Sequence, residues 1–513
     1  MSLGRSRVSA SFDVLVIGGE NLTGLLYAAL AAREGHRVGV ICQGSLPNTY
    51  RHEGHTFVRQ PERLYGLSTS PLVARVFNEL SLGIEIRNLP VSADPLVQIV
   101  FPDRRLAVSQ NPNRWLAELE RELPESVRVM QAFEAWSTRW MEASNGLFLS
   151  DVAVPTTGLR AKQSYKKLIE GCEHLVESVP PDGIPPLEVE RDSSVALALV
   201  EGVVSQLVEC RSRPMPPLVL ARLWNLIRSG SARVPGGIDG LRMMLLTKLR
   251  DQCGIYRDDA YVSELVIKRG RAVEVILADR SERLGCDLLV CNTDPRQLLQ
   301  MIPSSQRVQS FQSEILSRRP LGWRLTMNVA VDPKVIPVGM GAEVTLLAHN
   351  RTAGSSESPL WISRPGATDE SPVEGRPGPG VLVLSGMVQG RGATPTLADI
   401  ERTAHGMLSR LRTVVPWLDD HLQLVHVPCL VQDPSTGRSE VDMRLLTPIF
   451  DRTIPLTMGL GTLNPTTPYK NVLLAGDQLF AGMGLEGPFV GALQTLLRTR
   501  KSLPSRTQGT RML

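Results

Sequence analysis

Apolar and polar positions alternate in blocks along the chain, and the first block is the most regular. An apolar run at 13–17 is short enough for a buried parallel strand, helical apolar spacing follows at 24–34, and a second strand is predicted at 36–41. Gly18 and Gly19 interrupt the chain after the first strand. The opening is therefore predicted to be a strand, glycine turn, helix and strand of the kind that binds nucleotides.

The later blocks predict further helices and strands. Helical spacing is found at 71–82, 113–123, 161–179, 194–208, 217–229, 238–252 and 396–415. Strands are expected as a hairpin-like stretch at 55–67, two strands within 89–106, a hairpin of 261–268 and 272–278, and single strands at 286–291, 323–331, 343–348, 381–386 and 423–427. The stretches 178–186 and 351–380 are expected to be loops because of their proline, glycine and serine content. Residues 471–497 again predict a strand, a glycine-rich turn and a helix.

Composition restricts the class of protein. A chain of 513 residues exceeds one ordinary core, so two domains are expected. The hydrophobic fraction of 42% and charged fraction of 21% are those of a globular protein, and a net charge of +4 gives no reason to expect nucleic-acid binding. The seven cysteines are scattered without a C-x-x-C pair, which indicates a reduced, cytoplasmic protein without a zinc site.

Membrane and targeting signals are weak. No apolar core follows Arg5 and Arg7 as it would in a signal peptide, and no uninterrupted apolar stretch is long enough to span a bilayer. Residues 504–513 are expected to form a flexible tail, and the sparse arginines near this end favour a solvated terminus over a membrane patch. Peripheral membrane contact stays open, as does the oligomeric state.

The first glycine turn has two readings against the pattern G-x-G-x-x-G. A phosphate must approach the backbone closely at a helix N-terminus, so any Cβ there obstructs it. Starting at Gly19 places Asn21, which tolerates positive φ, in the middle position and Gly24 against the helix. Starting at Gly18 places Glu20 and Thr23 at those positions, so we favour the first reading.

Several stretches carry a family resemblance: the opening unit, VPGG-I-x-G-L at 234–241, the hairpin ending in LLVCNTDP, and NVLLAGDQLFAGMGLEGPFVGAL at the end. Together they resemble the phytoene desaturase and amine oxidase group of NAD(P)/FAD-dependent oxidoreductases over nearly the whole chain. The resemblance implies an α/β fold with a discontinuous, Rossmann-like FAD-binding domain and an inserted α+β substrate domain. The domains would comprise 1–80, 233–300 and 435–503 for FAD, and 81–232 and 301–434 for the substrate.

The same resemblance implies which residues would hold FAD. Asp477 would contact the ribityl and pyrophosphate region, the following helix start would bring N–H groups toward the isoalloxazine, and the backbone of Val262 would contact the adenine. The implied cofactor residues are Gly18, Gly19, Asn21, Gly24, Val262, Gly476, Asp477, Gly484, Leu485, Glu486 and Gly487. The flavin would carry the chemistry, so no nucleophile or metal motif is expected, and the catalytic residues stay unassigned.

The sequence departs from the family pattern at the pyrophosphate and adenosine end. Cys42 stands where an acid would bind the ribose, Gln60 replaces a glycine expected near the flavin, and no Gly-Gly-Arg loop follows the second strand. Two hypotheses follow. Either the protein is a desaturase-like or amine-oxidase-like flavoenzyme, or it has lost FAD and serves as a lipid-binding or scaffold protein, as the prenylated-GTPase escort proteins do on this fold.

The substrate is expected to be apolar, such as an isoprenoid or another lipid-like molecule. This expectation rests on the resemblance and on the strongly apolar helices at 194–208 and 217–229, which form either core or the wall of an apolar ligand site. A cavity lined by several charged side chains would instead favour a polar amine or amino acid. Among other candidates, Arg59 could contact an anion but is more typical of a surface arginine, and His52 and His55 are expected to be solvated.

Overall fold

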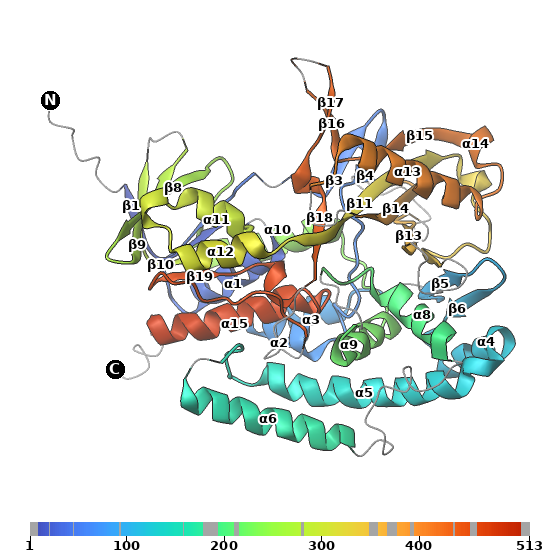
Figure 1. The fold of residues 1–513 in the computed structure, drawn as a ribbon, viewed down its shortest axis with the longest axis horizontal. Coiled ribbons are helices and arrows are strands. Elements are labelled where there is room, and N and C mark those ends of the chain that lie inside the picture. The colour runs from blue at the N-terminus through green and yellow to red at the C-terminus, as the bar shows by residue number, and fades with distance from the viewer. Residues whose placement is uncertain are drawn as a thin grey trace.

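The computed structural model describes residues 9–19, 21–44, 46–91, 94–156, 158–177, 193–209, 215–278, 282–347, 358–366, 377–389, 394–433, 435, 437–451 and 459–503. The predicted loop 178–186 and the tail 504–513 lie outside these residues, as do parts of 351–380. Two large sheets, two small hairpins and the helices that pack around them make up the described chain (Figure 1).

The first sheet has seven strands and gathers the start, middle and end of the chain. Its order is β7 (Ile255–Arg257), β2 (Val38–Ile41), β1 (Ala10–Ile17), β10 (Arg283–Cys291), β9 (Arg271–Leu277) and β8 (Val262–Lys268), with β19 (Val472–Leu474) also paired to β10. The pairings β7–β2, β2–β1, β1–β10 and β10–β19 are parallel, whereas β8 and β9 form an antiparallel hairpin. The expected α/β, Rossmann-like sheet from separate segments is confirmed.

Helices cover this sheet because its parallel strands are apolar on both faces. The central helix α1 (Leu22–Arg33) has every residue from Leu22 to Ala32 buried, and it packs against α10 (Gly237–Asp251) and α15 (Glu486–Ser502). Two helices, α2 (Pro71–Glu79) and α3 (Gly83–Arg87), pack next to each other, and α2 also contacts α15. Two more, α11 (Pro295–Met301) and α12 (Gln309–Ser317), follow β10.

The second sheet has eight strands and is mostly antiparallel. Its order is β15 (Leu422–His426), β11 (Pro320–Val331), β14 (Val381–Gln389), β13 (Leu360–Ser363), β12 (Glu343–Leu346), β5 (Val97–Val100) and β6 (Arg105–Val108), with β18 (Thr447–Phe450) paired to β11. Helix α13 (Leu397–Arg412) packs on it, followed by α14 (Leu418–His421). Two small hairpins, β3–β4 (Thr49–His52, His55–Val58) and β16–β17 (Leu430–Gln432, Ser439–Val441), form separate two-stranded sheets.

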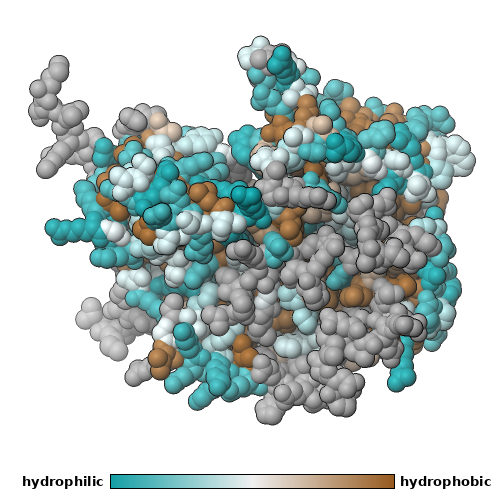
Figure 2. Space-filling model, viewed as in Figure 1, coloured by the Kyte–Doolittle hydropathy of each residue, from teal (hydrophilic) through white to brown (hydrophobic). Residues whose placement is uncertain are grey.

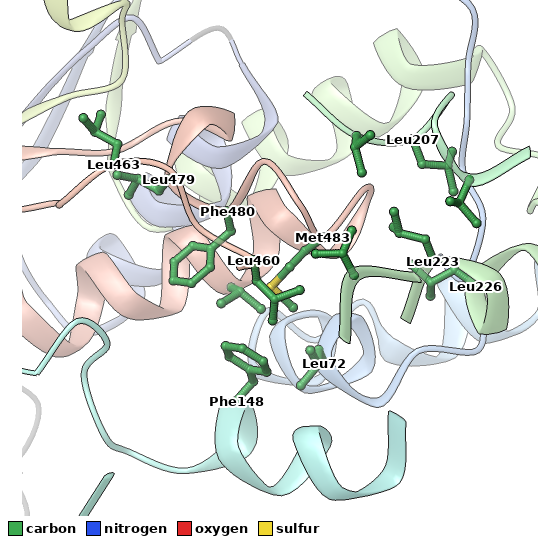
Figure 3. Packing of buried hydrophobic residues seen from close by; sticks show 14 of the residues in the cluster. Leu72, Phe148, Leu207, Leu223, Leu226, Leu460, Leu463, Leu479, Phe480 and Met483 are labelled. Carbon is green, nitrogen blue, oxygen red and sulfur yellow. The ribbon is translucent and has the colours of Figure 1, made fainter. Parts of the chain in front are cut away.

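The remaining helices form a layer below the two sheets in Figure 1: α4 (Pro112–Glu122), α5 (Val127–Leu149), α6 (Leu159–Glu177), α8 (Ser193–Val204) and α9 (Pro217–Arg228). The apolar helices α8 and α9 are core elements. Figure 3 shows Leu223 and Leu226 of α9 among the buried side chains that include Met483, with Phe148 facing Phe480. The rings of Phe148 and Phe480 meet edge-on, with centroids 6.2 Å apart. Core, and not a ligand wall, is thus the role of α9.

Several elements differ from the prediction. The early hairpin spans 49–58 and not 55–67, and helix α5 was not predicted. Strand β13 lies within the expected loop 351–380, because its four residues pair with β12 on one side and β14 on the other. The domain bounds stay a prediction, although β18 joins the second sheet while β19, from the same segment 435–503, joins the first.

The face shown in Figure 2 is mainly hydrophilic, with separate hydrophobic patches. Within the described part of the chain, no helix is both long and apolar enough to cross a membrane.

Candidate functional site

The carboxyl ends of β1 and β19 open onto one crevice, because both strands pair in parallel with β10 between them. The turn after β1 leads into α1, and Gly476 and Asp477 follow β19. Thr23, in the first turn of α1, donates its hydroxyl to Oδ1 of Asp477 at 2.6 Å. Asp477 therefore lies at the first turn of α1, where the 18–24 turn begins the helix.

Close packing within the protein explains two of the glycines in the first turn. A Cβ at Gly18, whose φ is +75°, would lie 2.5 Å from Cγ2 of Thr293, and a Cβ at Gly24 would lie 2.6 Å from Nδ2 of Asn292. The same Asn292 amide donates to the carbonyl of Gly18 at 2.6 Å. The end of β10 therefore occupies the space that a side chain at either glycine would need.

Asn21, the middle position of the favoured reading, does not adopt the positive φ that it could tolerate. Asn21 has φ −79° and ψ 158°, so it is extended and not left-handed, and it stands at the N-cap of α1 without a capping side-chain bond. Its side chain lines the crevice. A Cβ at Gly19 would lie 2.1 Å from Cγ1 of Val40, again a packing reason. Glu20 lies outside the described residues.

The predicted cofactor residues between Gly476 and Gly487 divide into those that face the crevice and those that do not. Asp477, Gly484 and Leu485 line the cavities, and Gly476 has φ +110°, which L-residues rarely adopt. A Cβ at Gly487 would lie 2.6 Å from the carbonyl oxygen of Phe480. Glu486 turns away: its side chain is fully buried in an ion pair with Arg222, 2.7 Å between Nη2 and Oε2. The structure therefore brings Asp477 to the crevice and leaves Glu486 inside the protein.

Two connected cavities lie at this crevice. The outer one, of about 700 Å³, is lined by residues that include Asn21, Leu22, Arg242, Arg296 and Trp323. The inner one, of about 160 Å³, is lined by residues that include Gln206, Arg324, Thr326, Phe480 and Gly484. Both share a boundary formed by Gln60, Pro61, Arg63, Glu209, Thr447, Asp477, Leu485 and Pro488. The expected apolar cavity is not what these residues form, because carboxylates and guanidinium groups line both spaces.

Three charged side chains from distant segments meet at the inner cavity. Burial, and after it the Asp477 carboxylate, raise the pKa of Glu209 to about 7, against the effect of Arg324 and Arg63. Burial lowers the pKa of Arg324 to about 10, and burial together with Arg324 lowers the pKa of Arg63 to about 9. Both guanidinium groups also lie near the ring of Trp361, at 5.8 and 6.0 Å. A carboxyl group that titrates near neutral pH thus faces two cations.

Burial is also the largest influence on the pKa of Asp477. It raises the pKa of this carboxyl group, whereas the Thr23 hydrogen bond and the charge of Arg242 act in the opposite direction.

Replacing Glu209 with Gln is expected to stabilise the protein above pH 7. The pKa of Glu209 is about 7 in the folded chain and about 4.3 in an unfolded one. A raised folded pKa favours folding at low pH, and this stabilisation is lost as pH rises from about 4 to about 7, where ionisation in the cavity becomes costly. The variant should be on the order of 1–3 kcal/mol more stable than the parent at pH 8 and equal to it near pH 4, in urea unfolding.

The matched control is Glu440→Gln on exposed β17, which should change stability little at either pH. An unchanged pH dependence in Glu209→Gln would show that this carboxyl group does not carry the burial cost.

The other sequence candidates lie away from the crevice. Arg59 donates to the carbonyl of Pro47 and lies over the ring of Tyr50, 4.6 Å from its centroid. His52 stacks near His426, with ring centroids 4.0 Å apart. In the described residues, no group of three or more metal-binding side chains is found.

Sequence reasoning missed Arg63, Glu209 and Arg324. One signal was present for Arg324, since it is a charged residue inside the apolar strand LGWRLTMNVAV. Glu209 and Arg63 lie in segments without a motif, so only the tertiary structure brings them together.

Comparisons with known proteins address the fold. No protein-family model matches the chain, and no curated protein matches it in sequence. An oxidoreductase from Methanosarcina mazei superposes with a TM-score of 0.56 at 14% identity, over 94% of this chain and 99% of the other. Cyclohexylamine oxidase from Brevibacterium oxydans gives 0.53 at 14% identity, over 96% and 99%.

The fold is that of the FAD-dependent oxidoreductases. A RAB GDI from Plasmodium falciparum has this fold too, with a TM-score of 0.55 at 10% identity over 95% of this chain and 97% of its own. Oxidoreductases and a GDI thus share the FAD-oxidoreductase fold, so the side chains of the site must decide between catalysis and binding. No finding singles out the phytoene desaturases within it.

The residues that line the crevice fit the flavin half of FAD, whereas the residues after β2 do not fit its adenosine half. At the flavin end, Asp477 lies beside the start of α1, and Gly484 and Leu485 line the space before α15. At the adenosine end, Cys42 and Gln43 follow β2, and the Gln43 side chain is hydrogen-bonded to the backbone of Val262. Its Nε2 donates to the Val262 carbonyl at 3.3 Å, and the Val262 N–H donates to its Oε1 at 3.2 Å. The crevice therefore has space beside Asp477, where the resemblance implies the flavin, whereas Gln43 is bonded to Val262, where the resemblance implies the adenine.

Proposed function

We propose that the protein is a flavin-dependent oxidoreductase that acts on a small polar substrate carrying both an amine and an anionic group. The observation that carries this proposal is the inner cavity, where Glu209 faces Arg63 and Arg324 next to the boundary formed by Asp477 and Leu485. The fold shared with cyclohexylamine oxidase supports an amine among polar substrates. The charged lining speaks against the isoprenoid or lipid-like substrate.

The cavity side chains suit two tasks. Arg63 and Arg324 can hold an anionic group of the substrate through their guanidinium N–H donors. Among the described residues, Nε of Arg324 is a buried donor without an acceptor, so a bound anion would satisfy it. Glu209, with a pKa of about 7, can accept a proton from the substrate ammonium group. A bound flavin would accept the hydride from the adjacent carbon.

The test uses the purified protein loaded with flavin. Under anaerobic conditions, amino acids and amino-carboxylate compounds should bleach the visible flavin absorbance, whereas amines without an anionic group and isoprenoids should not. Glu209→Gln is expected to slow bleaching by about 10²-fold, the usual size of a lost general base, and to flatten its pH dependence near pH 7. Glu440→Gln, on exposed β17, should react like the parent. Bleaching by isoprenoids, or an undiminished rate in Glu209→Gln, would contradict the assignment.

A second candidate function is a non-catalytic binding protein. The closed adenosine end and the fold shared with a RAB GDI favour it. A protein that retains no flavin after incubation and gel filtration would support this candidate and remove the first.

A further inference from the structure

The crevice is closed at one end by the protein itself. A dinucleotide in a sheet of this kind runs from the turn after the first strand to the end of the second strand, where an acid binds the ribose. In this chain β2 ends at Ile41, and the next residues are Cys42, whose thiol is buried, and Gln43. The adenosine of a dinucleotide would have to lie where Gln43 reaches across to β8.

Gln43 makes two hydrogen bonds there of the kind that the edge of a purine can make. Its amide nitrogen donates to the carbonyl of Val262, and its amide oxygen accepts from the N–H of the same residue. A carboxamide places one donor beside one acceptor, as the edge of adenine does, which is why glutamine and adenine pair so readily. Bound adenine would therefore compete with an existing pair of hydrogen bonds, and displaced Gln43 would need new partners.

The ring of Tyr261 narrows the same end. A Cβ at Gly44, whose φ is +83°, would lie 2.9 Å from Cε1 of Tyr261, so this ring packs directly against the backbone that follows Gln43. The residues that line the outer cavity include none of Cys42, Gln43 and Val262. Among the described residues, the outer cavity thus does not extend to these three.

The opposite end is equipped for a phosphate. Asn21 and Leu22 at the start of α1 line the outer cavity, where the first N–H groups of a helix attract anions. Arg242 lines the same space; its Nη1 donates to Oδ1 of Asp239 at 2.9 Å, and within the described chain its Nε has no acceptor. Its charge also acts on the carboxyl group of Asp477, which places it beside the flavin end.

We propose that the flavin site of this protein ends at the phosphate: it binds flavin mononucleotide, and Gln43 takes the place that adenine has in a dinucleotide. The proposal rests on the proposed flavin-dependent function. It accounts for Cys42 and Gln43 after β2, where a dinucleotide site would place an acid, in a crevice whose other end is lined by Asp477.

The experiment measures flavin fluorescence quenching by the purified protein, with FMN and FAD as separate ligands, and ADP binding by calorimetry. The parent protein should bind FMN at least 10-fold more tightly than FAD and should not bind ADP. Gln43→Gly should free the backbone of Val262, strengthen FAD binding at least 10-fold, create ADP binding, and change FMN binding less than 2-fold. Gln432→Gly, on the exposed edge of β16, is the control and should leave both affinities unchanged.

Each result decides the proposal. A parent protein that prefers FAD overturns this inference and leaves the flavin-dependent function standing. A protein that binds neither flavin overturns both proposals. If Gln43→Gly leaves the ratio of the two affinities unchanged and gains no ADP binding, Gln43 is not the closing residue and the inference fails, provided that urea unfolding shows the variant to be folded.

Discussion

Replacing Arg222 with Met is expected to lower the free energy of unfolding by about 3–5 kcal/mol, the cost of leaving a buried charge without its partner. The side chains of Arg222 and Glu486 are both fully buried, and Nε and Nη2 of Arg222 donate to Oε2 of Glu486 at 3.0 and 2.7 Å. Met has a similar reach and no charge, so the variant leaves the Glu486 carboxylate in an apolar interior with too few donors.

The effect should be large because the ion pair joins four helices. Ser70, the N-cap of α2, donates to Glu486 at the start of α15, and Arg222 of α9 donates to Ser144 and Asn145 of α5. Losing the arginine therefore removes contacts to both α5 and α15. Urea unfolding followed by circular dichroism measures the change.

Two further variants test whether the unpaired charge of Glu486 causes the loss of stability. Arg114→Met removes a pair with Asp94 in which the arginine side chain is 73% exposed, and it should cost less than about 1 kcal/mol. Combining Arg222→Met with Glu486→Gln should be less destabilising than Arg222→Met alone, since the stranded charge is then removed. A double variant that is as unstable as the sum of the two single changes would show that the pair is not the source.

Replacing Asp477 with Ala is expected to weaken flavin binding by roughly 10–100-fold, the size of one to two charge-assisted hydrogen bonds. Asp477 lines both cavities and is held in place by the Thr23 hydroxyl at 2.6 Å. Its free oxygen can accept from a flavin ribityl hydroxyl, and the alanine variant also leaves Thr23 without this acceptor. Flavin absorbance after gel filtration and fluorescence titration with FMN give the measurement.

The controls separate binding from folding. Asp420→Ala, at an exposed position of α14, should bind flavin like the parent. Thr23→Val should weaken binding less than Asp477→Ala, because it removes the positioning bond and leaves the carboxylate. If Asp477→Ala retains flavin with parental affinity while its urea midpoint is unchanged, Asp477 does not contact the ligand.

Local sequence patterns were sufficient to predict the elements that have a clear apolar period or a glycine signal of their own. The opening strand, glycine turn and helix, the hairpin of β8 and β9, and the final strand and helix were all predicted, because each has an apolar period or a glycine signal within some 30 residues. Strand β13 and helix α5 were not, since four residues beside proline- and glycine-rich loops, or a helix of mixed aromatic, polar and small residues, carry little local signal.

Sequence periodicity, together with the family resemblance, determined the α/β class and the discontinuous first sheet. Only the tertiary structure decided which side chains face the crevice. Glu486 follows Asp477 closely in the chain but pairs with Arg222, and Gln43 meets Val262 across 219 positions. Likewise Glu209, Arg63 and Arg324 come from three separate segments. The physical reason is that hydrogen bonds and charges act through space, whereas hydrophobic periodicity is read along the chain.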